Sequence, residues 1–578
     1  MKKHSIFAAV LLSLGMLVFS CNKVESDIQG PEEIIDNAQP VEMTFTATVS
    51  AKDATTKSVD ASGVTAWVAG EQMAVYYQKS DNSYATATAT VGTPNGDGSA
   101  PISATLSDAK NGSTVKFVYP AGLADASGDI DAAALAAQHG TIADISENFD
   151  AATGSGTLVT DGTSCGTSAQ ITMTNKVLIG KFTPKYSDVA IDAITRLIIS
   201  DGTNTYTITP EAPATEFDDQ GIYVAMLPVA NKLITITAET GAGNYAYYKS
   251  GITLAVGKLY NNLAIPMKPA TFVTTSTADA LRTTLTSVTT GSVIVMAAGT
   301  YVETNSNYIA FDKDVIAMAA PGASVTLQPK VPIQISDGGK ATLVGIKIDA
   351  SKLTELASWY EHIIYPSDAN AANSLVMESC EMYGFSLNKS AIYCSSSNKF
   401  ASVSLNNCYF HDIMKSCVFL EGVVGSFSLT NSTIANISTE TTSYWAGIFD
   451  IRETTAEVRV DHCTFYNCMA MNTDYGAIGK CLTADTIVSN CIFMMPTSTD
   501  ALRAFKGISG SQANYCMINN YLKDSGWGIH SDVTKTSCVK DTDPKFVDAP
   551  NGDFTLGAGS PALTASATSG PIGDPRWY

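Results

Sequence analysis

Apolar and polar residues alternate in the first part of the chain, beginning at residue 43. In the segment "MTFTATV" threonines separate the apolar side chains, which is the two-residue period of a half-buried strand. Similar segments recur to about Met267, and "LIISDGTNTYTITP" is typical of a hairpin that turns at Asp201 and Gly202. No long helical pattern interrupts them. The pattern therefore predicts a β-sandwich over residues 43–267.

Beyond residue 268 the dominant pattern is a repeat. Six segments, among them "LNNCYF", "VDHCTF" and "VSNCIF", align on a small residue at steps of 28, 24, 31, 28 and 25 residues. The aligned residues are Cys380, Cys408, Ser432, Cys463, Cys491 and Cys516. A second series, 13 to 16 residues ahead of the next aligned position, comprises Ile392, Val418, Ile448, Ile478 and Leu502. Two series that advance together predict the stacked coils of a solenoid.

The cysteines of this repeat are predicted to be structural. The segment "VRVDHCTFYNC" brings an aspartate, a histidine and two cysteines together, but Cys463 is the aligned small residue, and a thiol suits an inward position in a coil. His462 falls where sister segments carry Asn407, Asn431 and Asn490, a position typical of a turn. We therefore expect a turn residue at His462 rather than a metal ligand. Disulfide cross-links between coils are left as the alternative.

The two ends of the repeat region resemble those of pectate-lyase-type β-helices. "STADALRTTLTSV" predicts a capping helix over about 276–288, with Ser276 as its cap, and leads into the strand "GSVIVMAAGTYVE". The last residues, about 541–578, resemble the closing segment common in such proteins. The resemblance implies a right-handed parallel β-helix over residues 268–578, similar to β-helical domains of unknown function in Bacteroidetes lipoproteins.

Four motifs in the sandwich region carry a second resemblance. "TFTATV", "AWVAGEQMAVYY", "KFVYPAG" and "GITLAVGKLYNNLAIPM" occur in this order and resemble fimbrillin-like domains of Bacteroidetes surface lipoproteins. The resemblance implies fimbrial subunits as partners. Fimbrillins can polymerise after cleavage at an early arginine, and this chain has no arginine before Arg196. We therefore expect an accessory, anchor or stand-alone role rather than that of a main pilin subunit.

The beginning of the chain predicts export. Two lysines precede an apolar run over residues 6–19, the pattern of a signal peptide covering residues 1–20. The residues ending at Cys21 resemble a bacterial lipobox, which implies acylation of Cys21 and an anchor in the outer membrane at the cell surface. Residues 21–42 are acidic and contain prolines, as in a solvated tether.

Composition and charge narrow the range of partners. Charged residues make up only 16% of the chain, and the formal net charge is −20. A strongly negative protein is repelled by phosphate backbones. Nucleic acid is therefore excluded as an expected partner, and a secreted all-β protein fits the composition.

One group of charged residues could carry out catalysis. Asp450 and Lys480 lie two positions beyond apolar residues of the second series, so we expect them on neighbouring coils, with Arg452 and Arg503 on or beside the same strands. A lyase acting on a uronate needs a cation that neutralises the carboxylate and a base that removes the adjacent proton. These residues supply both types. The alternative is a partly buried ion pair, because the two-residue period places Asp450 and Lys480 on the side of the apolar series.

Aromatic residues near the same strands indicate binding. The predicted glycan-binding residues are Tyr444, Trp445, Phe449 and Tyr475, with Phe449 expected to point outward. Aromatic faces beside acids and amides suit the apolar faces and hydroxyl edges of sugar rings. The alternative is that these rings pack beneath loops.

The residue patterns favour a binding protein over an enzyme. No metal-binding motif is present, so we expect no cofactor, while Ca²⁺ held by Asp450 or Glu421 stays open. We predict a non-catalytic surface lipoprotein for adhesion or glycan capture, with polysaccharide or cell-surface glycan as its ligand. The alternatives are a polysaccharide lyase acting on uronate-containing glycans and an accessory or tip subunit of a fimbria-like assembly.

Overall fold

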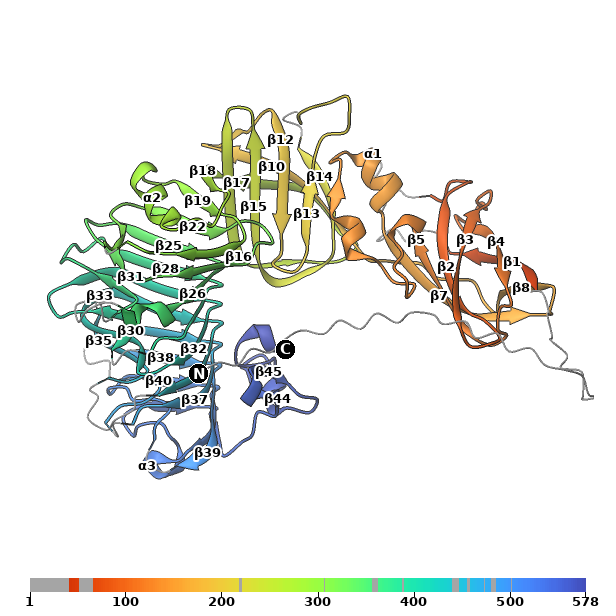
Figure 1. The fold of residues 1–578 in the computed structure, drawn as a ribbon. Helices are drawn as coiled ribbons and strands as arrows, with labels where there is room; N and C mark the ends of the chain where they lie inside the picture. The colour runs from red at the N-terminus through yellow and green to blue at the C-terminus, as the bar shows by residue number, and fades with distance from the viewer. Residues whose placement is uncertain are drawn as a thin grey trace, which may run out of the picture.

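The computed structural model describes residues 41–50, 66–217, 221–305, 307–355, 362–386, 389–438, 446–454, 458–471, 474–479, 485–499 and 502–578. Within these residues the protein is all-β and consists of two β lobes followed by a parallel β-helix (Figure 1). The predicted signal peptide, Cys21 and almost all of the predicted tether lie outside the described residues. No helix in the described ranges is long and apolar enough to cross a membrane.

Lobe 1 is one sheet with strand order β5-β2-β3-β4-β1-β8-β7-β9, and β5 also pairs with β7. Its strands are β1 (Glu42–Val49), β2 (Gln72–Gln78), β3 (Tyr84–Val91), β4 (Ala100–Ser107), β5 (Thr114–Tyr119), β7 (Ala152–Thr160), β8 (Ser164–Thr167) and β9 (Thr174–Asn175). The alternation predicted for the first strand is present, since Met43, Phe45 and Val49 are buried and the threonines at 44 and 46 are exposed. Trp67 packs edge-on against Tyr119 in the core, with 5.1 Å between ring centroids.

Lobe 2 has its own core. One sheet contains β10 (Leu178–Tyr186), β11 (Val189–Ala190), β14 (Ile222–Met226) and β17 (Leu259–Pro266), and the other contains β6 (Ala137–Gln138), β12 (Ile194–Ser200), β13 (Thr205–Ile208), β15 (Val229–Thr240) and β16 (Gly243–Leu254). Four short helices, η1 (Ala121–Leu123), η2 (Ala132–Leu135), α1 (Ile142–Asp144) and η3 (Ile145–Phe149), lie between β5 and β7 of lobe 1 in sequence. The predicted hairpin is β12–β13, where Ser200 pairs with Thr205. Residues 43–267 therefore fold around two hydrophobic cores, whereas the sequence suggested a single sandwich.

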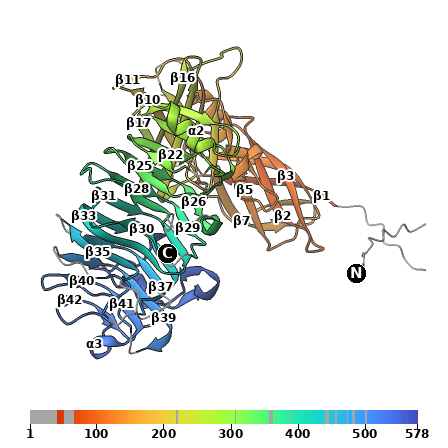
Figure 2. The same cartoon turned by 60° about the vertical axis from the view of Figure 1, so that its left-hand side comes forward.

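The β-helix has three faces, which we name A, B and C in the order in which the chain visits them. Face A contains β19 (Val293–Met296), β22 (Val315–Ala319), β25 (Lys340–Val344), β28 (Ser374–Glu378), β31 (Lys399–Asn406), the end of β33 (Ser416–Thr430), β36 (Val458–Asp461), β38 (Thr486–Ser489), β40 (Gln512–Asn514) and β42 (Thr534–Thr536). Face B contains β20 (Gly299–Val302), β23 (Val325–Gln328), β26 (Ile346–Asp349), β29 (Glu381–Tyr383), β32 (Tyr409–Ile413), β34 (Thr433–Ser438), β37 (Thr464–Met469), β39 (Ile492–Thr499), β41 (Met517–Tyr521) and β43 (Val539–Lys540). Face C contains β21 (Ile309–Phe311), β24 (Ile333–Ile335), β27 (Ile364–Pro366), β30 (Ser390–Cys394), the start of β33 and β35 (Phe449–Thr454), and single bridges continue it through Ile478, Phe505 and Ile529. The coils stack from α2 (Ala280–Ser287) at one end to α3 (Lys523–Gly526) at the other (Figure 2).

The turn between faces A and B repeats in every coil of the middle and last parts of the β-helix. Its residues all have left-handed backbone conformation, with φ from 51° to 54°, and they are Ser379, Asn407, Asn431, His462, Asn490, Tyr515 and Ser537. Asparagine tolerates this conformation better than most residues, which explains its recurrence. The prediction that His462 occupies a turn position is confirmed.

The aligned small residues follow this turn and point into the core. All six predicted positions are buried, and their cysteines are free thiols. The thiol of Cys463 donates to the carbonyl of Leu429 in the preceding coil at 3.5 Å, and its backbone N–H donates to Sγ of Cys491 in the next coil at 3.4 Å. Ser432 has the same role, because its hydroxyl accepts from the backbone N–H of Cys408 at 2.9 Å.

The predicted capping helix is α2, and Leu281, Leu285 and Val288 bury its apolar side. Its N-cap residue is Asp279 and not Ser276 as predicted. The Asp279 carboxylate accepts from the backbone N–H groups of Thr304 and Asn305 at 2.8 and 3.0 Å. The Asp279 side chain therefore hydrogen-bonds to the loop after β20 and not to the first turn of the helix.

Lobe 2 is joined to the β-helix without a break in the sheet. Strand β16 pairs with β18 (Lys268–Val273), which pairs in turn with β19 of face A. Leu233, Ala246 and Tyr248 of lobe 2 pack against outward side chains of face A, such as Val295 and Met318. This apolar contact fixes lobe 2 on the first coils of the β-helix.

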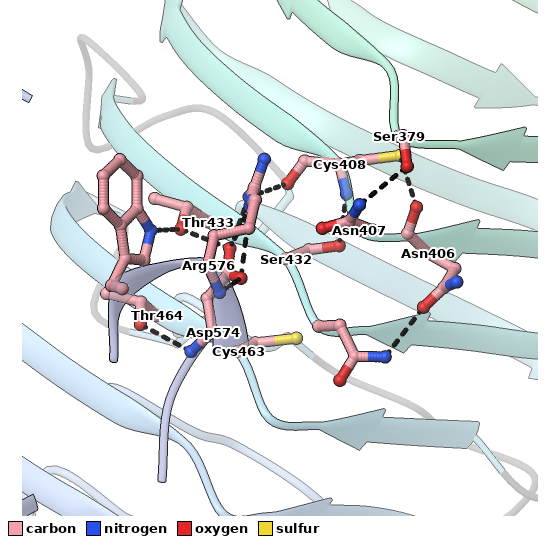
Figure 3. Close-up of polar contacts among 12 residues, drawn as sticks. Ser379, Asn406, Asn407, Cys408, Ser432, Thr433, Cys463, Thr464, Asp574 and Arg576 are labelled. Carbon is pink, nitrogen blue, oxygen red and sulfur yellow. Dashed lines mark hydrogen bonds and ion pairs between the residues drawn. The ribbon is translucent and has the colours of Figure 1, made fainter. Parts of the chain in front are cut away.

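A closing segment, residues 541–578, returns across face B. It contains β44 (Phe546–Asp548), β45 (Asp553–Leu556) and three short helices, η5 (Ala549–Asn551), η6 (Pro561–Thr564) and η7 (Pro575–Trp577). Asp574 accepts from the hydroxyl of Thr433 at 2.6 Å, and Arg576 donates to the carbonyl of Cys408 at 2.7 Å (Figure 3). The segment is thus pinned to neighbouring coils of the solenoid.

Candidate functional site

Face C carries a continuous outward row, which we call the face C ladder. Strand pairing aligns one outward position from each of seven successive coils, and these positions are occupied by Gln334, Tyr365, Tyr393, Phe419, Asp450, Gly479 and Lys506. Each of these residues follows an apolar residue that points into the core, such as Ile364, Ile392 or Val418. In-register pairing brings successive side chains within about 5 Å of each other along the stack.

The first half of the ladder is aromatic. Tyr365 packs edge-on against Tyr308 at 5.9 Å between centroids, and its hydroxyl accepts from Nε2 of Gln334 at 3.2 Å. His362 stacks on Tyr393 at 4.1 Å with only 15° between the ring planes. The tyrosine, histidine and phenylalanine side chains of this row are half-buried, so each has a surface that a ligand can contact.

Arg452 closes the aromatic row with a set of paired charges. Its guanidinium lies 4.4 Å from the ring centroid of Phe419 and 5.9 Å from that of Tyr475. Its Nη1 lies 3.4 Å from Oε1 of Glu421, and its Nη2 lies 3.5 Å from Oδ2 of Asp450. One cation therefore contacts two carboxylates and two aromatic rings, an arrangement that holds it firmly.

The second oxygen of Glu421 connects this charge set to the aromatic row. Oε2 of Glu421 accepts from the hydroxyl of Tyr393 at 3.0 Å. Tyr393, Phe419, Glu421 and Arg452 therefore form one connected surface across three coils. The packing and the hydrogen bonds limit rotation of these side chains before any ligand arrives.

Asp450 lies beneath this surface and differs in register from the prediction. Its side chain has no exposed area, and its Oδ2 accepts from the backbone N–H of Gly447 at 3.3 Å. It aligns with Phe419 and Gly479 on the outward side of the strand, whereas the sequence placed it with Leu420 and Lys480 on the apolar side. The reason is that Phe449, and not Ile448, aligns with Val418.

The same register shift corrects the expectation for Phe449. Phe449 points into the core with no exposed area and contacts Phe410, Phe427 and Phe465. It is not an outward residue and has no surface to offer a sugar. Tyr475 does adjoin the site through Arg452, although it is almost fully buried at 5% exposure.

Arg503 belongs to a different ion pair. Its guanidinium binds the carboxylate of Asp524 near α3, with Nη2 3.1 Å from Oδ1. Burial raises the pKa of Asp524, but the hydrogen bond and charge of Arg503 outweigh it and lower the pKa. Lys480, Tyr444 and Trp445 lie outside the described residues, so their predicted roles stay predictions.

The described part of this site offers aromatic and polar contacts to a ligand, whereas Lys480 lies outside it. A lyase needs a cation and a base that the substrate can reach. Here Arg452 is already paired with Glu421 and Asp450, and Asp450 has no exposed area. Among the residues that the structure describes, no group of histidine, cysteine and acidic side chains is arranged to hold a metal ion; the Ca²⁺ alternative stays a prediction.

The residues that sequence reasoning missed share a simple signal. Tyr365 and Tyr393 both stand one position after an inward aliphatic residue of face C. The search for charged residues looked two positions after the apolar series, which returns to the inward side of a strand. The search for outward aromatic residues did look one position after that series, but it did not extend to Tyr365 and Tyr393.

Comparisons with known proteins find similarity to one family model and to several solved structures. A family model described as a domain of unknown function (DUF5123) matches residues 458–577, the last coils and the closing segment. No curated protein matches the sequence significantly. Among solved structures, a PL6 family alginate lyase is 13% identical with a TM-score of 0.31, over 47% of this chain and 37% of the lyase.

Two further solved structures are similar to about two fifths of this chain. A putative cell adhesion protein from Bacteroides uniformis is 15% identical with a TM-score of 0.23, over 40% of this chain and 98% of its own length. A fimbrial protein from Bacteroides ovatus is 13% identical with a TM-score of 0.20, over 39% of this chain and 48% of that chain. The matches thus span less than half of the lyase and of the fimbrial protein. At such low identities and TM-scores they carry no statement about the function of this chain.

Proposed function

We propose that this protein is a non-catalytic, glycan-binding adhesion or capture protein of the cell surface, and that the face C ladder is its binding surface. The observation that carries this proposal is the row of half-buried rings from Tyr365 to Phe419, aligned by strand pairing and ended by the clamped Arg452. Aligned rings offer a glycan chain several stacking positions in a row.

The chemistry of the row suits sugars. The ring faces accept the apolar C–H faces of pyranoses, while Gln334, Glu421 and the tyrosine hydroxyls supply donors and acceptors for the hydroxyl edges. The mutual contacts of these side chains hold them in place, which lowers the entropy lost on binding. Repeated coils also allow a long ligand to contact several positions at once, so weak contacts add up.

The rest of the chain supports a presenting role. Lobe 1 lies at one end of the molecule and the later coils of the β-helix at the other (Figure 1). We infer that lipidation at Cys21 anchors the protein in the outer membrane and that the two lobes carry the β-helix outward. An accessory role in a fimbria-like assembly is the alternative, and protease-dependent laddering on unboiled gels would favour it.

Glycan-array and calorimetric binding test the proposal. We expect the full chain to bind at least one glycan, and Tyr393→Ala to weaken that binding by about tenfold, since a ring contact is worth about 1 kcal/mol or more. Tyr84→Ala is the matched control, because Tyr84 is an exposed tyrosine of lobe 1 that stacks on Tyr76. Unchanged binding in Tyr393→Ala and Tyr365→Ala would remove the ladder as the binding surface.

An assay for unsaturated uronate released from pectin, alginate and glycosaminoglycans, with and without Ca²⁺, tests the lyase alternative. We expect no release. Release that disappears in Arg452→Ala would overturn the non-catalytic proposal and assign the reaction to this site. Release that persists in Arg452→Ala would overturn it as well, and would place the reaction elsewhere.

A further inference from the structure

A cleft of about 600 Å³ lies where lobe 2, the β-helix and the closing segment meet. Lobe 2 contributes the β12–β13 turn and the start of β15, the β-helix contributes turns next to face A, and the closing segment contributes its last residues. Lobe 2 and the closing segment lie on the same side of the β-helix (Figure 1). The cleft has the size of an ordinary small-ligand site and the position at a domain junction where such sites are common.

The walls of this cleft are fixed in place. Gly322 of the β-helix approaches lobe 2 so closely that a Cβ on it would lie 2.2 Å from the hydroxyl of Thr205. Beyond the cleft, the hydroxyl of Ser250 in lobe 2 donates to Oε2 of Glu378 in face A at 2.7 Å. Together with the apolar contact between β16 and face A, these contacts preform the cleft.

Cations from all three parts line the cleft, in a chain whose net charge is −20. They are Lys232 of lobe 2, Lys347 of β26 and Arg576 of η7. Lys347 pairs with the half-buried Glu381, and Arg576 pairs with the buried Asp574 behind the cleft. Lys232 is exposed and has no ion-pair partner among the described residues.

The acidic side chain that lines the cleft is already engaged. Asp201 is buried at 5% exposure, and its Oδ1 accepts from the backbone N–H groups of Thr203 and Asn204 at 2.8 and 2.7 Å. Its other oxygen accepts from the side-chain amide of Asn204 at 3.1 Å. Asp201 therefore shapes its turn, and Lys232 is left to attract an anion.

Neutral polar groups complete the lining. The left-handed turn between faces A and B directs Ser379 and Asn407 toward the cleft, where the amide of Asn407 donates to Oγ of Ser379 at 2.6 Å. Figure 3 shows these two residues and Arg576 on adjacent elements. Thr203 and Asn231 of lobe 2 line the opposite wall.

We propose that this cleft binds a short segment of an acidic glycan, with Lys232 and Lys347 meeting a carboxylate or sulfate group and the amides and hydroxyls meeting sugar hydroxyls. Cations combined with neutral hydrogen-bonding groups match a sugar that carries one anionic group per ring or per disaccharide. The proposal does not rest on the face C ladder, which uses different residues.

The test measures binding of the full chain to three probes. They are a galacturonate hexasaccharide, which carries carboxylates, a heparin hexasaccharide, which carries sulfates, and cellohexaose, which is neutral. We expect at least one acidic probe to bind and to lose affinity as salt increases. Whichever acidic probe binds more tightly identifies the anionic group. Equal binding of cellohexaose, or no binding of either acidic probe, would overturn the proposal.

Two substitutions assign binding to the cleft. Lys232→Ala should weaken binding of the acidic probe by about two- to fivefold, the size of one exposed charge contact, and Lys232→Glu should weaken it further. Lys249→Ala is the matched control, because Lys249 is an exposed lysine of β16 outside the cleft. Lys232 is exposed, so these variants should fold normally.

The two sites can fail separately. If binding of the acidic probe is lost in Tyr393→Ala and kept in Lys232→Glu, the glycan binds at the ladder and the cleft proposal is wrong. If the reverse holds, the cleft is supported and the ladder is not. Displacement of the probe by equimolar inorganic phosphate would reveal a nonspecific anion site and would also overturn the proposal.

Discussion

Faces B and C of the β-helix both carry outward aromatic side chains, but these side chains differ in how far they are buried. On face B the closing segment covers the later coils, and Phe554 packs at 1% exposure against Tyr466, Phe546 and Trp577. On face C the rings of Tyr365, Tyr393 and Phe419 stay half-buried. The closing segment therefore buries the Tyr466 ring of face B, whereas the face C rings keep exposed surface.

The difference separates stability from recognition. The rings of face B belong to hydrophobic clusters that include side chains of the closing segment, as expected for burial that stabilises the fold. The rings of face C are held by edge contacts, a hydrogen bond and a clamped arginine, which fix their orientation without burying them. Half-buried rings in a fixed row are a reason to look for a ligand on face C.

The largest difference is expected between replacing Phe554, which packs over face B, and replacing Phe419 on face C. We expect Phe554→Ala to lower the free energy of unfolding of the β-helix by about 3–5 kcal/mol, because it leaves a cavity beneath the closing segment. Phe419→Ala should cost about 1 kcal/mol, because its ring is only half-buried. Differential scanning calorimetry of the full chain measures both, and the transitions of the two lobes serve as internal references.

Equal losses in these two variants would contradict the comparison. They would mean that face C contributes to the fold as much as face B does. The proposed binding role of the ladder would then lose its main structural argument.

A buried acid at the first coil should make the β-helix sensitive to pH. Burial raises the pKa of Glu303 to about 7, with a further contribution from Asp279 and opposition from Arg282. Between its ordinary pKa of 4.5 and about 7, the folded state holds a proton that the unfolded state has released. Stability should therefore fall as pH rises through this window, by about 3 kcal/mol for a shift of this size.

Glu303→Gln provides the control for this pH effect. A neutral amide cannot ionise, so the variant should lose less stability than the parent chain between pH 4.5 and 7.5. Denaturant unfolding at several pH values measures the difference. Identical pH profiles for the two proteins would show that Glu303 does not hold its proton in the folded state.

His411 should produce a smaller pH effect on the part of face B beside the closing segment. Burial lowers its pKa, but hydrogen bonds from its ring to Glu381 and Asp412 outweigh burial and raise the pKa. A raised pKa stabilises the fold fully below about pH 6.5, and this stabilisation is lost as pH rises through the folded-state value. We expect His411→Gln to cost about 1 kcal/mol at low pH.

The quantity to measure for His411 is the difference in the free energy of unfolding between the parent chain and His411→Gln at several pH values. That difference should shrink as pH rises, which NMR titration of the imidazole can check directly. A cost in His411→Gln that is independent of pH would mean that ring stacking with Tyr383 and Tyr409, and not the charge, is what matters.

The sequence predicted the solenoid well because its repeat is enforced by burial and backbone conformation. A position that faces the core beside a tight turn admits few residues, so Cys463 and its counterparts recur with little variation. The left-handed turn similarly favours asparagine, which identified the role of His462. Such local constraints act in every coil and leave a readable pattern.

The face C ladder was harder to predict because the loops before it vary in length. Counting back from the next cysteine placed the inward position at Ile448 and Leu502, whereas strand pairing places it at Phe449 and Phe505. A shift of one residue exchanges the two sides of a strand. The sequence therefore predicted Phe449 to point outward and Asp450 inward, the reverse of their orientations in the structure. The alternation of apolar and polar residues identifies a strand but not the sheet to which the strand belongs. For this reason the sequence did not show that residues 43–267 divide into two hydrophobic cores.

The smallest effect expected concerns the turn that leads from face A into face B. His462 has a φ of 51°, and its Nδ1 lies 3.0 Å from Oδ1 of Asp461. His462→Asn should change stability by less than about 0.5 kcal/mol, because asparagine adopts this conformation readily, whereas His462→Val should cost about 1–2 kcal/mol. Chemical unfolding of the two variants measures the contrast. If His462→Asn were instead as costly as His462→Val, the imidazole itself would matter, and the turn would owe its stability to the contact with Asp461 and not to backbone conformation. The expected outcome would show that backbone conformation, and not the imidazole, stabilises this turn.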